Sequence, residues 1–88
     1  MAINEYCRMR LSIKKELTKA KLVLQSFLLR HDKKYTEGDT WTLKHRAWLK
    51  NIHFEEEYLN EAFNEYMISV NTLEQRIKTI HFYRRKVI

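Results

Sequence analysis

The stretch FLLRHDKKYTEGDTWTLKHRAWL, from Phe27 to Leu49, decides how this chain folds. It separates two long segments in which apolar residues recur with a helical period, and it holds Gly38, the chain's single glycine. The chain of 88 residues has no proline, so almost nothing outside this stretch would end a helix. The polar run from His31 to Thr40 therefore predicts a bend between two helices.

Apolar residues on both sides of the bend recur at alternating steps of three and four. This spacing is typical of helices that pack at shallow angles, as in coiled coils. We call these positions the hairpin seam: Ile3, Tyr6, Arg10, Ile13, Leu17, Ala20, Leu24, Phe27 and His31 before the bend, and Leu59, Phe63, Tyr66, Val70, Leu73, Ile77 and Ile80 after it. The predicted fold class is all-α, as one helical region with a long helix at about 3–31, a bend with a short helix at about 32–52 and a second long helix at about 54–80.

The length of the first helix indicates an elongated molecule. A helix over residues 3–30 would span about 42 Å. A compact globule of this chain length would have a radius of gyration of only about 12 Å. We therefore expect an extended, coiled-coil-like hairpin.

The bend is expected to have a small core of its own. Asp39 or Thr40 is expected to cap a short helix that carries Trp41, Leu43 and Trp48. Aromatic side chains here could stack on bases, but tryptophans seven residues apart on a capping helix more often close a core. The predicted bend core is Phe27, Tyr35, Trp41, Trp48 and Phe54.

A second apolar stripe runs along the first helix, away from the seam. We call it the outer stripe; it consists of Cys7, Leu11, Leu22 and Leu29, with Thr18 between them, all within about 60° of one another. A hairpin covers one side of this helix, so the outer stripe requires another surface. Because chains this small gain little net stability from their own core, a second copy is the simplest partner. The sequence therefore predicts a homodimer.

The net charge of +6 lies entirely in the first part of the chain, since residues 36–88 carry equal numbers of basic and acidic residues. Arg8, Lys15, Lys19 and Arg30 fall within about 60° on the first helix, and we call them the outer basic face. Such a line of cations would neutralise phosphates without reading bases, which predicts weak, sequence-independent contact with DNA or RNA. A merely solubilising face is the alternative.

Residues that would carry chemistry do not form a site in the sequence. His31, His45 and His53 lack the spacing of two ligands on one helical turn, and a single cysteine completes no set, so no metal and no cofactor are expected. Glu57, Glu61 and Glu65 share a helical face that we interpret as solvated. The sequence shows no transmembrane span or signal peptide, which indicates a cytoplasmic protein without a membrane partner.

Residues 17–77 resemble a known family. The matching motifs are Ala20-Lys21, Phe27–His31, Tyr35, Trp41-Thr42, His45, Trp48-Leu49 and Phe63–Tyr66. They are similar to the middle of transposases of the insertion-sequence family numbered one hundred and ten, which have a DEDD motif and, in members, guidance by a bridge RNA. The resemblance implies a helical, coiled-coil region that joins a RuvC-like nuclease domain to a domain with a catalytic serine, and that helps in dimerisation and RNA contact.

The resemblance also implies that no catalytic residue lies in this chain, because the nuclease acids would precede Met1 and the serine domain would follow Ile88. Asp32 stands where the family usually has glycine, so a different cap geometry is expected at this helix end. The tail from His81 departs from the family pattern, which suggests truncation or a frame change. The alternative function is an autonomous small basic helical protein that binds nucleic acid or another helix.

Overall fold

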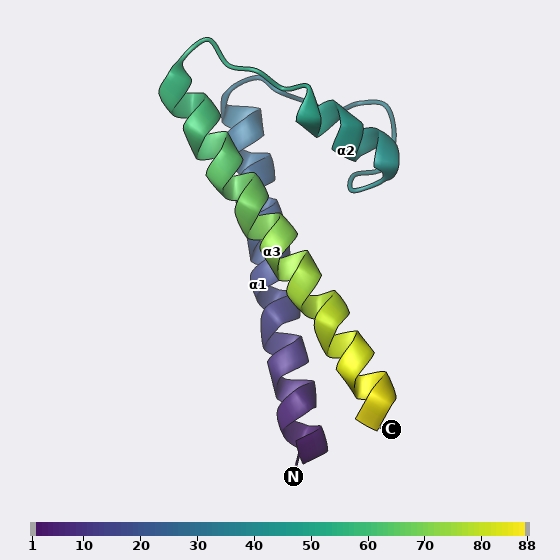
Figure 1. The fold of residues 1–88 in the computed structure, drawn as a ribbon. Helices are drawn as coiled ribbons and strands as arrows, with labels where there is room; N and C mark the ends of the chain where they lie inside the picture. Colours follow the sequence, from purple (N-terminus) through teal and green to yellow (C-terminus); the bar gives the residue numbers. More distant parts are fainter. Residues whose placement is uncertain (1, 88) are drawn as a thin grey trace.

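The computed structural model describes the backbone of residues 2–87 and the side chains of residues 5–80. The described residues form three helices: α1 (Ala2–Arg30), α2 (Leu43–Lys50) and α3 (Glu57–Val87). Figure 1 shows α1 and α3 side by side and antiparallel, with both chain ends at one end of the molecule and α2 beside the other. The predicted all-α hairpin with a short helix at its bend is confirmed.

The molecule measures 50 × 25 × 15 Å, and its radius of gyration is 15.7 Å. This exceeds the roughly 12 Å of a compact globule, because α1 and α3 are too long to pack as a ball. None of the described helices is long and apolar enough to cross a membrane.

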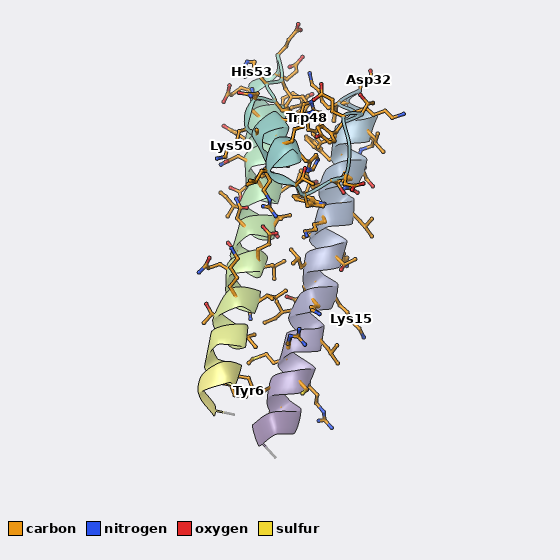
Figure 2. All side chains as sticks on the ribbon, turned by 90° about the vertical axis from the view of Figure 1, so that its right-hand side faces the viewer. Tyr6, Lys15, Asp32, Trp48, Lys50 and His53 are labelled. Atoms are coloured by element: carbon orange, nitrogen blue, oxygen red, sulfur yellow. The ribbon has the colours of Figure 1, made fainter. Side chains whose placement is uncertain are left out.

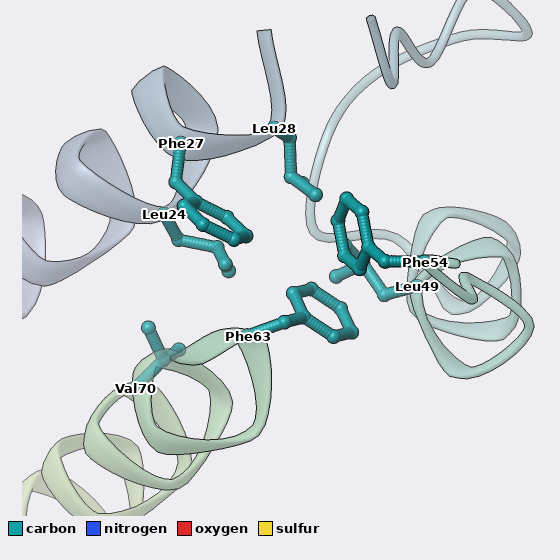
Figure 3. Packing of buried hydrophobic residues seen from close by; sticks show 7 residues of the cluster. All are labelled: Leu24, Phe27, Leu28, Leu49, Phe54, Phe63 and Val70. Carbon is teal, nitrogen blue, oxygen red and sulfur yellow. The ribbon is translucent and has the colours of Figure 1, made fainter. Parts of the chain in front are cut away.

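The core lies mainly at the bend end of the hairpin. Figure 3 shows side chains of α1, α3 and the bend converging there, with Leu24 and Val70 fully buried. The core cluster is Leu24, Phe27, Leu28, Leu49, Phe54, Phe63 and Val70. From Tyr6 to Ile80, every predicted seam position is buried or half-buried, as the heptad spacing requires. The side chains of Ile3 and of the tail from His81 lie outside the described ones.

The end of α1 corrects one expectation. The N–H of Lys33 donates to the carbonyl of Leu28 at 2.8 Å, and the N–H of Asp32 donates to that of Leu29 at 3.2 Å. Asp32 has a φ of 60°, so the two bonds form the Schellman motif that a glycine usually completes. The expected change of cap geometry is therefore wrong. Aspartate can take this place because its short polar side chain tolerates the left-handed region better than most.

The start of α2 differs from the expectation as well. The N-cap is Thr42, whose hydroxyl oxygen accepts the N–H of His45 at 3.2 Å and donates to the carbonyl of Asp39 at 3.2 Å. The predicted caps, Asp39 and Thr40, lie too early in the chain. Trp41 does not belong to the helix either, because its φ of 67° is left-handed.

The start of α3 is set by one side chain. The carboxamide of Asn60 accepts the N–H of Phe54 and donates to its carbonyl, each at 2.9 Å. These bonds satisfy both backbone groups of Phe54 outside the helix. As a result α3 begins at Glu57 instead of near residue 54, and its backbone continues to Val87.

Candidate nucleic-acid and partner surfaces

The five aromatic residues predicted for the bend core come together around the end of α1 and α2. Phe27 and Phe54 are buried with their ring centroids 5.5 Å apart, and each pairs edge to face or tilted with further rings. Tyr35 and Trp48 are half-buried, 5.3 Å apart, and Trp41 is also half-buried. The ring contacts form two groups: Phe27 and Phe54 belong to one in the core, and Tyr35, Trp41 and Trp48 meet around His45 in the other.

A polar network ties the bend to both long helices. Arg46 of α2 donates to both carboxylate oxygens of Glu74 on α3, at 3.0 and 2.6 Å. Lys21 of α1 lies 3.8 Å from the same carboxylate and 4.9 Å above the Trp41 ring. The hydrogen bonds from Arg46 lower the pKa of Glu74, and the same bonds raise the pKa of Arg46. We call Lys21, Trp41, Arg46 and Glu74 the Glu74 network.

Sequence reasoning missed the Glu74 network. Its members come from both long helices, the loop and α2, so no spacing along one element reveals it. The available signal was Glu74 itself, the only acidic residue after Glu65, in a segment that is otherwise basic. The bidentate contact with Arg46 is the geometry in which guanidinium and carboxylate bind most strongly.

His45 has a structural place at the centre of the bend. Its side chain is 2% exposed, and its Nδ1 accepts the backbone N–H of Trp41 at 2.8 Å. Burial lowers the pKa of His45, and the neighbouring charge of Arg46 lowers it further. The imidazole is therefore neutral, with its proton on Nε2. Among the described residues, no three His, Cys, Asp or Glu side chains gather where they could hold a metal ion.

The outer basic face lies on the side of α1 that α3 does not cover. Arg8, Lys15, Lys19 and Arg30 are all exposed. Figure 2 shows Lys15 extending away from the hairpin. Arg8 lies 3.7 Å from Glu5, but both side chains are at least 75% exposed, so this pair contributes little.

The outer stripe lies next to this face. Leu11, Leu22 and Leu29 are between 56% and 59% exposed, and Cys7 and Thr18 are exposed as well. Leu11 and Leu22 border a shallow hollow of about 360 Å³ whose other walls include Lys15 and Lys19. Apolar and cationic side chains are thus interleaved on one surface of α1.

A comparison with known proteins relates the chain to one class of protein. The chain is 38% identical over 80 residues to the transposase for insertion sequence element IS1533 from Leptospira borgpetersenii. This chain is similar to part of an insertion-sequence transposase. The match covers 90% of the chain and 23% of the relative, so the chain spans about a quarter of that transposase. No protein-family model matches the chain, and no solved structure matches it.

The relative confirms the coarser part of the predicted resemblance, which is to an insertion-sequence transposase. The family numbered one hundred and ten, its DEDD motif and its guide RNA stay predictions.

Proposed function

We propose that this chain is the helical region of an insertion-sequence transposase that joins a RuvC-like nuclease domain to a serine-bearing domain. In this function it brings two copies together and contacts DNA or guide RNA, and it supplies no catalytic residue. One observation carries the proposal: the face of α1 that the hairpin leaves open has exposed leucines interleaved with lysines. Sequenced DNA on either side of the coding region tests the joining function, because reading frames for a nuclease and a serine domain should flank it.

The outer stripe favours an antiparallel pairing of α1 with α1 of a second copy. If the twofold axis passes near residue 20, Leu11 lies opposite Leu29 of the second copy and Thr18 lies opposite Leu22, since each pair of numbers has the same sum. A parallel pairing would instead place each lysine of α1 beside its own copy. The antiparallel register therefore pairs the apolar groups of the outer stripe with one another.

A disulfide experiment tests this register. In a chain with Cys7→Ala, we expect Thr18→Cys and Leu22→Cys variants, mixed and oxidised, to form the mixed disulfide in preference to either homodimer. Light scattering should show a dimer that Leu22→Glu converts to a monomer, while Val23→Glu, a control on another part of α1, leaves it dimeric. A monomeric parent chain, or dominant Thr18→Cys homodimers, would contradict the antiparallel pairing.

Contact with nucleic acid is expected to depend steeply on salt. When the outer basic face binds a DNA duplex, the logarithm of the binding constant should fall linearly with the logarithm of the salt concentration. The slope should correspond to three or four phosphate contacts per chain. The Lys15→Gln/Lys19→Gln variant should flatten that slope by roughly 1.5 to 2, because two contacts are lost. The matched control, Lys50→Gln/Arg76→Gln, removes the same charge from other elements and should change it much less. Equal salt slopes for the two double variants would mean that the outer basic face does not contact phosphates and serves only to keep the chain soluble.

A further inference from the structure

A cavity of about 210 Å³ opens at the bend, between the last turn of α1 and the start of α2. Its apolar walls come from Leu28, Leu29 and Trp48. Figure 2, viewed from the side of α2, shows Trp48 at the bend end of the molecule. Lys33 and Lys34 also line the cavity, and none of the lining side chains is acidic.

The fold holds this cavity open. The left-handed turn at Asp32 ends α1 and sends the chain past the last helical turn, so that Lys33 to Tyr35 form one wall. On the other wall, the ring of Trp48 stacks on the buried His45 ring at an interplanar angle of 22°. Leu28 below is 3% exposed. These groups are held by the core, so a bound molecule would meet a largely formed site.

The side chains around the cavity match the parts of one nucleotide. Apolar and aromatic walls suit a flat base. The Lys34 ammonium suits its phosphate, and the Lys33 ammonium, which lies 5.5 Å from the centroid of the Phe54 ring, would turn from that ring to join it. The carboxamide of Gln25 and the hydroxyl of Thr40 add neutral groups that can hydrogen-bond to the edge of a base. The hydroxyl of Tyr35 is buried and has no hydrogen-bond partner in the described structure. A bound molecule that displaced this side chain from its contacts with His45 and Trp48 could offer the missing acceptor.

We propose that this cavity binds one unstacked nucleotide, with the base against Trp48 and Leu28 and the phosphate at Lys33 and Lys34. This proposal rests on the proposed function, in which α1 contacts the nucleic-acid backbone. It adds a contact between the cavity and a single-stranded part of the same nucleic acid. The site distinguishes strands with accessible bases from duplexes. It does so without reading which base is bound, because every base has a flat face.

Tryptophan fluorescence tests the proposal with three probes: a short oligothymidylate, the same strand with abasic sites, and free thymidine monophosphate. The oligothymidylate should quench the emission and bind about five- to a hundredfold more tightly than the abasic strand. If free thymidine monophosphate quenches the emission at the same concentration as oligothymidylate, the cavity binds free nucleotides and not a nucleotide within a strand. Equal affinity for the two strands, with unchanged emission, would overturn the proposal.

Two variants test whether the quenching and the preference for the strand with bases arise at the cavity. Lys33→Gln/Lys34→Gln should weaken quenching by oligothymidylate, while Lys44→Gln/Lys50→Gln, with the same charge change at α2, should not. Tyr35→Phe should fold at least as stably and lose part of the preference for the strand that has bases. Suppose that the parent chain binds the oligothymidylate and the abasic strand equally while Lys15→Gln/Lys19→Gln still flattens the salt slope. That result would reject nucleotide binding in the cavity and leave the proposed function standing.

Discussion

At the scale of single residues, two left-handed positions shape the bend. Asp32 closes α1 with a φ of 60°, and Trp41 precedes α2 with a φ of 67°. A bulky residue in this region is strained and persists only where its surroundings hold it. For Trp41 those surroundings are the bond from its N–H to His45, the bond from Arg46 to its carbonyl, and the ammonium of Lys21 above its ring.

Asp32→Gly is expected to raise the free energy of unfolding by about 0.5 kcal/mol, because glycine adopts the left-handed cap without steric cost but loses more entropy on folding. Asp32→Ala should lower it, because alanine keeps the steric cost and has no polar side chain to offset it. Urea unfolding followed by circular dichroism measures both. Equal stability of the two variants would mean that the left-handed conformation at residue 32 carries no steric cost.

At the scale of elements, α2 depends on its contacts. A helix of eight residues is too short to be stable in water by itself. Leu49 anchors α2 in the core, the Glu74 network joins it to α1 and α3, and His45 holds the turn before it. Leu43, at the first position of α2, is 88% exposed and contributes nothing to this anchoring.

The contacts of His45 predict that the chain loses stability in mild acid. Its folded pKa lies below the unfolded value of 6.5, so the unfolded chain binds the proton more readily. The free energy of unfolding should therefore decrease as the pH falls from about 6.5 toward the lowered pKa. Protonation of Nδ1 would also remove the acceptor for the N–H of Trp41.

Urea unfolding at pH values above and below this window measures the effect. His45→Phe should be less stable at neutral pH, because the N–H of Trp41 loses its acceptor, and its stability should change less with pH. His53→Gln, at an exposed position, is the matched control and should keep the dependence of the parent chain. An unchanged pH dependence in His45→Phe would assign the titration to other groups.

At the scale of the whole molecule, the hairpin buries the seam and leaves the outer face of α1 open. The proposed function predicts that the isolated chain neither cleaves nor joins DNA strands, with or without magnesium. The described residues hold no cluster of three potential metal ligands, and Glu57, Glu61 and Glu65 are exposed on one face of α3. A gel assay on supercoiled DNA measures this. Magnesium-dependent nicking that survives purification and disappears in Glu57→Gln/Glu61→Gln would contradict the prediction.

The sequence by itself determined the hairpin and the faces of its helices. Helical period relates sequence spacing directly to direction around an axis, so residue numbers alone divide a long helix without proline or internal glycine into seam, outer stripe and outer basic face. The exposure of Leu11, Leu22, Lys15 and Lys19 follows from that period. The bend was also readable, because Gly38 lies in the polar run between the helices.

Only the tertiary structure decided how the bend is built. Whether Asp39, Thr40 or Thr42 caps α2 depends on the path of the loop, which the contact between His45 and Trp41 sets. The Glu74 network and the cavity beside Trp48 combine residues from separate elements. Such contacts depend on distances across the fold, and a period along one helix contains no information about them.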